Sequence, residues 1–175
     1  MHDMICSFAV RTLRRAAALV VFALPGLPAT AAVFNDNDIA RISEISDAIM
    51  SLDDEVSRAM HDLPPDDAEE IEAYSYVELN LQAAQERLNS VFLLTAVSIY
   101  MESPIDQQQI ENLMYRQILP QSRIFLHQKT DAIASMAASH PSKAEFKAYS
   151  ARAAAILSER AVPLLQELSR RIEAP

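Results

Sequence analysis

Apolar residues recur every three or four positions over two long stretches in the first half of the chain. They are Ile42, Ile45, Ile49, Leu52, Val56, Ala59 and Leu63 in the first stretch, and Tyr74, Val77, Leu81, Ala84, Leu88 and Val91 in the second. This spacing places the apolar side chains of each stretch on one face of an α-helix. Because Pro64 and Pro65 separate the stretches, the sequence predicts helices at about 37–63 and 67–102.

The second half of the chain repeats this pattern behind recognisable helix starts. Ser103 followed by Pro104 is typical of an N-cap and a first helical residue, and residues 142–145, Ser-Lys-Ala-Glu, have the form of a capping box. Helices are therefore expected at about 104–139 and 143–173. Their predicted core residues are Ile110, Leu113, Met114, Ile118, Phe125, Ala132, Ile133 and Met136, then Phe146, Tyr149, Ala153, Ile156, Leu157, Leu164, Leu168 and Ile172.

Four long helices with short connections, and no alternating strand pattern, predict an all-α fold. The expected architecture is an up-down-up-down antiparallel four-helix bundle made of two long helical hairpins. Pro120 and Pro163 lie inside the third and fourth helices. Each proline removes a backbone donor and clashes with the carbonyl four residues earlier, so we expect both helices to be kinked or broken there.

The two prolines lie at similar distances from the turn between their helices, and this placement has three interpretations. The bends curve one hairpin around the other, they open a gap in the core that takes a small polar ligand, or the prolines lie at this level by chance in an exposed stretch. The second interpretation predicts a pocket lined by Arg87, Gln117, Pro120, Arg160 and Pro163.

The first 31 residues have the pattern of a secretory signal peptide. Basic residues precede an apolar run, and the small residues Ala29-Thr30-Ala31 follow it. Cleavage is expected after Ala31 or Ala32, which leaves one domain at 32–175 in the periplasm or outside the cell. The alternative is an uncleaved anchor, because residues 16–34 are just long enough to span a bilayer.

Glycine and cysteine each occur once, as Gly26 and Cys6, and both lie in the predicted signal peptide. The rest of the chain therefore lacks the glycines of phosphate loops, nucleophile elbows and EF-hands, and the thiols of disulfides and of cysteine-ligated zinc. No histidine has the Glu-x-x-His spacing of a di-iron bundle. The sequence predicts no cofactor, no metal, no catalytic residue and no enzymatic activity.

Negative charge is concentrated in the first predicted hairpin. Residues 32–103 contain 16 Asp and Glu against 3 Lys and Arg, which argues against binding to nucleic acid. The predicted turn between the first two helices carries Asp62, Asp66, Asp67, Glu69, Glu70 and Glu72. This acidic turn is interpreted as complementary to the more basic second hairpin, as a docking patch for a basic partner, or as a weak divalent-cation site.

Residues 91–101, VFLLTAVSIYM, are apolar around almost the whole helix. One face is enough for a bundle, so the surplus predicts an interface for another protein or a second copy of the chain. The predicted contacts are Phe92, Leu93, Leu94, Val97 and Tyr100. The alternative is that neighbouring helices and the segment at Val33-Phe34 cover this surface.

Together these patterns predict an exported, periplasmic, non-enzymatic helical bundle that acts by protein-protein interaction through the acidic hairpin, the apolar end of the second helix, or both. A small-ligand-binding or sensing bundle with a pocket at the level of Pro120 and Pro163 is the alternative. We expect the chain to contact the membrane only transiently, through the signal peptide.

Overall fold

The computed structural model describes residues 33–139 and 144–173, and every regular element in these two ranges is helical. Contacts divide the chain into Met1–Thr30 and Ala31–Pro175, and all described residues belong to the second unit. The predicted signal peptide and most of the predicted capping box at 142–145 lie outside the described residues. The all-α prediction is confirmed.

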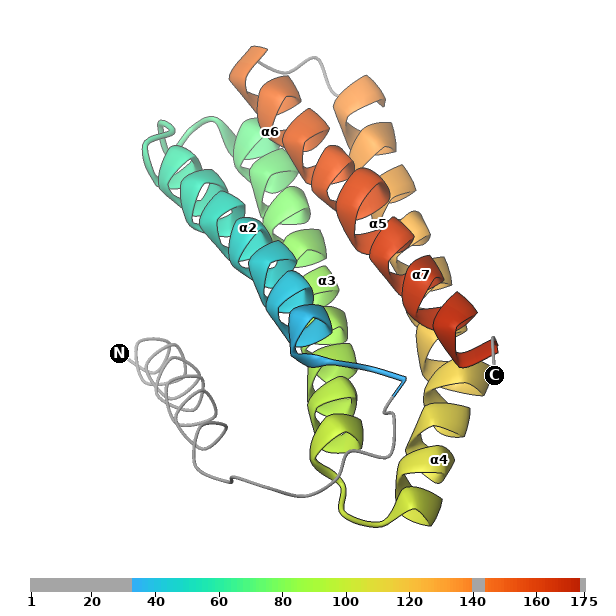
Figure 1. Ribbon diagram of the computed structural model, residues 1–175. Coiled ribbons are helices and arrows are strands. Elements are labelled where there is room, and N and C mark those ends of the chain that lie inside the picture. The colour runs from blue at the N-terminus through green and yellow to red at the C-terminus, as the bar shows by residue number, and fades with distance from the viewer. Residues whose placement is uncertain (1–32, 140–143, 174–175) are drawn as a thin grey trace. The chain divides into compact units, whose positions relative to one another are not determined.

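Four long helical stretches follow one another along the chain (Figure 1). The first two are α2 (Asp36–His61) and α3 (Ala68–Tyr100). The third comprises α4 (Pro104–Leu113), η1 (Met114–Ile118) and α5 (Leu119–Ser139), and the fourth comprises α6 (Ala144–Ala155), η2 (Ile156–Ala161) and α7 (Val162–Glu173). Where their ends are described, they lie within two residues of the predicted boundaries.

The helix starts follow from side chains that satisfy free backbone donors. The side chain of Asn35 accepts from the N–H of Asn37 at 3.0 Å, while the N–H of Asn35 donates to Asp38 Oδ2 at 2.9 Å, which closes a capping box on α2. Ser103 Oγ accepts from the N–H of Asp106 at 3.4 Å, and Pro104 is the first residue of α4, as predicted.

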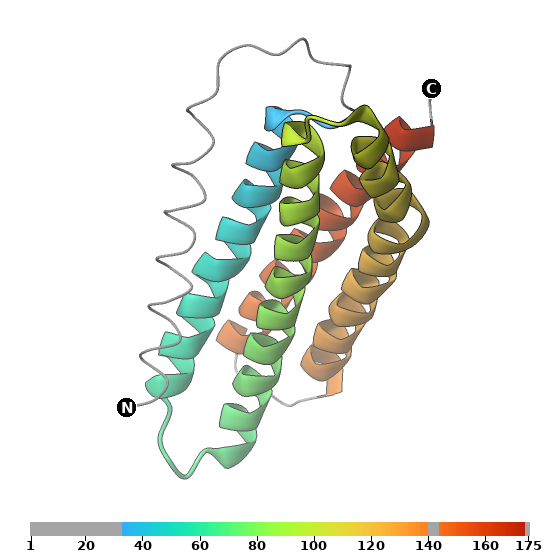
Figure 2. The same ribbon diagram turned by 90° about the horizontal axis from the view of Figure 1, so that it is seen from below.

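The stretches pack in a sequence of neighbours: α2 contacts α3, α3 contacts α5, α5 contacts α6 and α7, and η2 and α6 contact α2 (Figure 2). The predicted apolar faces of α2 and α3 form much of the core, since Ile42, Ile49, Leu81 and Leu88 are all fully buried. Near the start of α6, Phe146 lies 5.2 Å from Tyr74 between ring centroids. Burial of these apolar side chains is the main stabilising contribution.

Neither proline breaks its helix, in contrast to the stronger form of the prediction. A π-helical turn, η1 or η2, instead precedes each proline. The N–H of Leu119, just before Pro120, bonds the carbonyl of Met114, and the N–H of Val162, just before Pro163, bonds that of Leu157. Each bond spans five residues instead of four, and the wider turn gives the proline ring room beside the carbonyl with which it would otherwise clash.

The π turns also change which residues face the core. Leu113 and Phe125 were expected inside, but Leu113 is 40% exposed and Phe125 is only half-buried. The fully buried apolar residues of this stretch are Met114, Leu119, Leu126 and Ile133, of which Met114 and Ile133 were expected inside. The step of five from Met114 to Leu119 is the length of one π turn, and it moves the apolar face of α5 forward by one residue.

Candidate functional site

The last third of α3 has its polarity reversed. Thr95 and Ser98 are fully buried, whereas Leu93 is 58% exposed and Val97 is 46% exposed. Val91, Thr95 and Ser98 continue the buried positions of the helix at intervals of four and three. The face that points into the fold therefore receives two hydroxyls, and the opposite face presents leucine and valine to solvent.

This outward face, which we call the α3 apolar strip, consists of Leu93, Val97 and Tyr100, with Phe92 and Leu94 half-buried at its edges. Its composition matches the predicted interface. Tyr100 is about half exposed, and its hydroxyl donates to Asp36 Oδ1 at 2.8 Å, which ties the end of α3 to the start of α2. Partial burial and this hydrogen bond both raise the pKa of Tyr100.

The buried hydroxyls belong to a group of polar side chains that we call the polar end, which consists of Asp38, Thr95, Ser98, Gln107 and Glu111. One carboxylate oxygen, Glu111 Oε1, accepts from Ser98 Oγ at 3.3 Å and from Gln107 Nε2 at 3.2 Å. The backbone N–H of Val33 donates to the same oxygen at 3.4 Å. Thr95 Oγ1 is buried and has no hydrogen-bond partner among the described residues.

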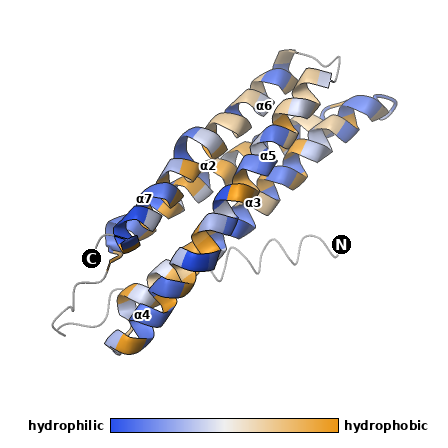
Figure 3. Ribbon diagram, turned by 90° about the vertical axis from the view of Figure 1, so that its right-hand side faces the viewer, coloured by the Kyte–Doolittle hydropathy of each residue, from blue (hydrophilic) through white to orange (hydrophobic). Residues whose placement is uncertain are grey.

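An ion-pair network links α2 to α7 beside the polar end. Arg171 donates two hydrogen bonds to Asp38, one of them from Nη1 to Oδ2 at 3.0 Å, and Asp38 is 1% exposed. Arg41 makes a two-pronged bond to Glu167 at 2.8 and 2.7 Å. The hydrogen bonds from Arg41 lower the pKa of Glu167, which favours its ionised form. The end of α7 is correspondingly hydrophilic in Figure 3.

The sequence did not single out the polar end, although its pattern contained a clue. The heptad face that runs through Leu81, Ala84, Leu88 and Val91 continues to Thr95 and Ser98. Hydroxyl residues at core positions require partners, because an unpaired buried polar group is unfavourable. Following that face to its end would have predicted polar partners on the next helix, where Gln107 and Glu111 lie.

The acidic turn is only partly a solvated cluster. Asp62, Asp66, Glu69 and Glu72 are exposed and Asp67 is half-buried, but Glu70 is buried and does not belong to a solvent-facing patch. Glu70 contributes, after burial and Glu145, to raising the pKa of Tyr74 to about 12. Within residues 33–139 and 144–173, no group of three or more His, Cys, Asp or Glu could hold a metal ion.

The five residues of the predicted proline pocket fall into separate places. Arg87 reaches the turn that follows Pro120, where its Nε donates to Ser122 Oγ at 2.9 Å. Arg160 instead pairs with Glu44 of α2, with Nη2 to Oε1 at 2.8 Å. Gln117 and Pro163 are both exposed. The structure therefore brings Arg87 to Pro120 but does not bring Arg160 and Pro163 to the same point.

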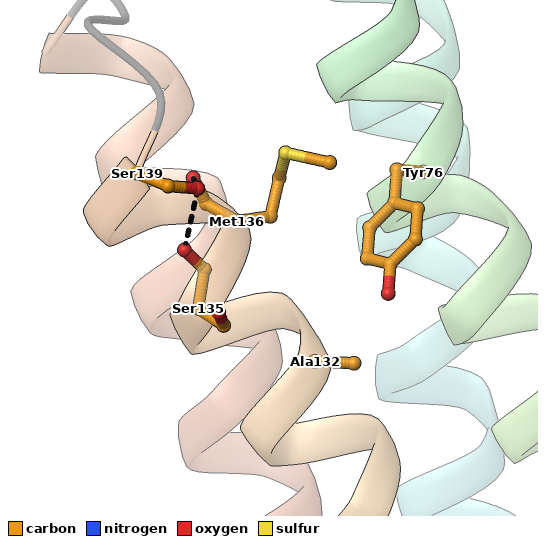
Figure 4. Close-up of a pocket in the computed structure, with 5 residues that line it drawn as sticks. All are labelled: Tyr76, Ala132, Ser135, Met136 and Ser139. Carbon is orange, nitrogen blue, oxygen red and sulfur yellow. Dashed lines mark hydrogen bonds between the residues drawn. The ribbon is translucent and has the colours of Figure 1, made fainter.

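A shallow recess of about 240 Å³ lies between α3 and the end of α5 (Figure 4). Tyr76, Ala132, Ser135, Met136 and Ser139 line it. The Met136 thioether extends toward the ring of Tyr76, and the Ser139 hydroxyl is turned back to bond the carbonyl of Ser135 at 2.9 Å. With no charged side chain in its lining, this recess offers little to orient a polar ligand.

Among the described helices, none combines the length and the apolar character that crossing a membrane requires. Comparison of the chain with models of known protein families, with curated proteins and with solved structures found no match.

Proposed function

We propose that this chain is an exported, periplasmic, non-enzymatic protein that acts by binding another protein, or a second copy of itself, through the α3 apolar strip. The observation that supports this most directly is the reversed polarity of α3. Exposing Leu93 and Val97 while burying Thr95 and Ser98 is unfavourable for an isolated domain, because both choices lose apolar burial. A partner that covers the strip restores that burial.

We further propose that the four stretches form an up-down-up-down antiparallel bundle. The chain of contacts from α2 through α3 and α5 to α6 and back to α2 supports it. In this arrangement the apolar strip lies at one end of the bundle, and the acidic turn lies at the other. The exposed carboxylates of the turn, Asp62, Asp66, Glu69 and Glu72, would supply a second contact to a basic region of a long partner.

A pocket at the proline level has weaker support as a function. Two π turns at the two prolines are unusual, and such turns often occur at functional sites. However, Arg160 already pairs with Glu44, and Pro163 faces solvent, so the groups expected to meet a ligand do not converge. We therefore favour the apolar strip.

Site-specific photo-cross-linking in cells tests the proposal. A photo-reactive residue is placed at Leu93 in the full chain, and in a matched variant at Ile124 on α5, which is 59% exposed but lies outside the strip. We expect a discrete protein adduct from position 93 and none from position 124. The adduct's mass distinguishes a second copy from a different protein.

Two results would count against the proposal. Equal cross-linking at both positions would show that exposure alone determines the adducts. No adduct at position 93, in protein shown to be exported, would mean that the strip faces solvent in the cell. In a further pair of variants, the photo-reactive residue is placed at Val97. Leu93→Ser should then remove the adduct at position 97, and Ile124→Ser should leave it.

A further inference from the structure

The backbone nitrogen of Val33 lies 3.4 Å from Glu111 Oε1, on the polar end. For a neutral amide this is a long hydrogen bond, because such bonds are usually near 2.9 to 3.0 Å. The separation is nevertheless well within the range of an ion pair. Val33 is also one of the residues at which a processed chain could begin, since small residues occupy both positions that a signal peptidase reads before it, Thr30 and Ala32.

From this geometry we propose that cleavage of the Ala32–Val33 bond creates an α-ammonium on Val33 that pairs with the carboxylate of Glu111. The inference rests on the export proposed above and adds the site of cleavage and its structural consequence. Hydrolysis consumes one water and leaves a carboxylate on Ala32, which departs with the leader, and an ammonium on Val33. The new positive charge arises within reach of Glu111.

The position of the Val33 nitrogen is set by the residues that follow it. Phe34 is 1% exposed and belongs to the apolar core. Asn35 caps α2 through its capping box with Asp38, and Asp38 is held in turn by Arg171. These two anchors, one and two residues away, fix the new terminus beside Glu111, so the pairing requires little further ordering of the chain.

The surroundings of Glu111 favour the binding of a positively charged group to its carboxylate. It is half-buried, and the three described donors to its Oε1 are the hydroxyl of Ser98, the amide of Gln107 and the N–H of Val33, all of them neutral. No Lys or Arg side chain in the described part of the chain forms a salt bridge with it. A partly buried carboxylate is stabilised by an opposite charge at this distance, and the neutral amide of the uncleaved chain cannot supply one.

The pairing would link processing to the formation of the interaction surface. The segment that precedes α2, the last part of α3 and the last turn of α4 meet at Glu111. Nearby, Asp36 at the start of α2 bonds Tyr100 of the α3 apolar strip. Before cleavage, this corner has only neutral bonds to Glu111. After cleavage, an ion pair joins Val33 to Glu111 of α4 and stabilises the end of the fold that carries the strip.

The first measurement is the intact mass of the protein purified from the cell envelope after expression of the full chain. A mass that starts at Val33 is the expected result. A start at Ala32 would overturn this inference while leaving export intact. An intact Met1 in the envelope would overturn this inference and favour the uncleaved anchor, whereas an intact Met1 in protein found only in the cytoplasm would overturn the export proposal as well, so the two failures are distinguishable.

The second measurement is the reactivity of the α-amine toward an acylating reagent near neutral pH, in the same purified protein. Only the unprotonated amine reacts, and a neighbouring carboxylate favours the protonated form. A rise of half to one pKa unit slows acylation by about 3-fold to 10-fold. We therefore expect Glu111→Gln to react at least about 3-fold faster than the wild type.

Glu86→Gln is the matched control, because it removes the same charge from an exposed position of α3. It should react at the wild-type rate. Circular dichroism verifies that both variants remain helical, and if Glu111→Gln does not, Glu111→Asp replaces it, since the shorter side chain withdraws the carboxylate from Val33. Equal acylation rates in the wild type and the folded Glu111 variant would overturn the inference.

Discussion

The turn between α2 and α3 lies at one end of the fold, and the connection between α3 and α4 lies at the opposite end (Figure 1). Aromatic rings pack together at the first end, whereas directed polar bonds gather at the second. Tyr74, Phe146 and Tyr149 form the first region, the aromatic end, where the ring centroid of Tyr74 lies 5.2 and 6.0 Å from those of the other two. The polar end, around Ser98, Gln107 and Glu111, also has the buried ring of Phe34 beside it, but it adds a group of directed polar bonds inside the fold. The same four helices are therefore held together by two different kinds of interaction.

The difference has a physical consequence. Apolar burial is non-directional and is almost independent of charge state, so the aromatic end provides stability under most conditions. Hydrogen bonds and ion pairs depend on geometry and on protonation, so the polar end responds to changes in charge nearby. The polar end is therefore the part of the fold whose stability changes when a charge is added or removed nearby.

Removing a ring from the aromatic end should give the largest loss of stability. Phe146 is fully buried, and Phe146→Ala should lower the free energy of unfolding by about 3 to 5 kcal/mol. Phe125→Ala is the control on α5, where the ring is half-buried, and it should cost less than half as much. Urea titration followed by circular dichroism measures both. Similar losses for the two variants would remove the distinction between the ends.

Breaking the ion pair at the polar end should have the next largest effect. Arg171→Met keeps much of the aliphatic length but leaves the buried carboxylate of Asp38 without its cation, which should cost about 2 to 3 kcal/mol. Arg170→Met changes the neighbouring, exposed arginine and should alter stability by less than about 0.5 kcal/mol. If the two variants unfold at the same urea concentration, Asp38 does not depend on Arg171.

Most of the helical framework could be predicted from the sequence, because caps and apolar periodicity are local features. The cap at Ser103 and the core faces of α2 and α3 were predicted in this way. The face of α5 was not, because a π turn inserts one residue into the helical register. A proline shows that the hydrogen-bond ladder is interrupted, but it does not show whether the chain bends, breaks or widens.

The candidate surface was predicted only in part. An excess of apolar residues at 91–101 led to the prediction of an interface. The structure shows Leu93 and Val97 exposed, and the interface itself stays a prediction. The bonds to Glu111 join residues far apart in the sequence, and Val33 and Glu111 are 78 positions apart. Contacts of this kind depend on how the helices are placed side by side, which periodicity does not specify.

Stability at the middle of the α2–α3 pair should depend on pH through Asp53. Burial is the main cause that raises the pKa of Asp53 to about 6, and Gln82 opposes it. A raised folded-state pKa means that this group contributes stability below about pH 4, and that the contribution is lost as the pH rises through about 6.

Asp53→Asn tests this dependence. Because the carboxylate is partly exposed, we expect only about 1 kcal/mol of added stability at pH 7 and no gain at pH 4. Glu86→Gln, at an exposed position of α3, should keep the wild-type dependence. A stability difference between Asp53→Asn and the wild type that stays constant from pH 4 to pH 7 would contradict the expectation. Thermal unfolding in matched buffers measures it.

Removing the unpaired hydroxyl of Thr95 at the polar end should change stability less than the substitutions above. Unlike most core substitutions, it should stabilise the protein. Thr95→Val has nearly the same shape and removes a buried donor that has no described partner, so it should stabilise the protein by up to about 1 kcal/mol. Ser98→Ala removes a hydroxyl that does bond Glu111 and should destabilise by about 1 kcal/mol. A destabilising Thr95→Val would show that its hydroxyl has a partner in solution.

We expect the smallest change in stability from a substitution of Pro120. This substitution tests whether the proline or the packing of the core maintains the π turn η1. If the core requires the π turn, because Leu119 and Leu126 must both face inward, then Pro120→Ala keeps η1 and changes stability by less than about 1 kcal/mol. If the proline alone enforces it, the substitution closes the turn to an α-helix. Closing the π turn shifts the helical register by one residue. This shift rotates α5 by about 100° and moves Leu126 out of the core.

We expect the first outcome, since both sides of the turn are anchored by buried residues, Met114 before it and Leu119 after it. Hydrogen exchange at the backbone amide that Pro120→Ala introduces, together with urea titration, measures the result, and Pro163→Ala provides the comparison at an exposed proline. A loss above about 2 kcal/mol in Pro120→Ala would show that the proline enforces the turn, because only a rotated α5 exposes that much apolar surface. An unchanged stability would instead assign the π turn to the packing of the core.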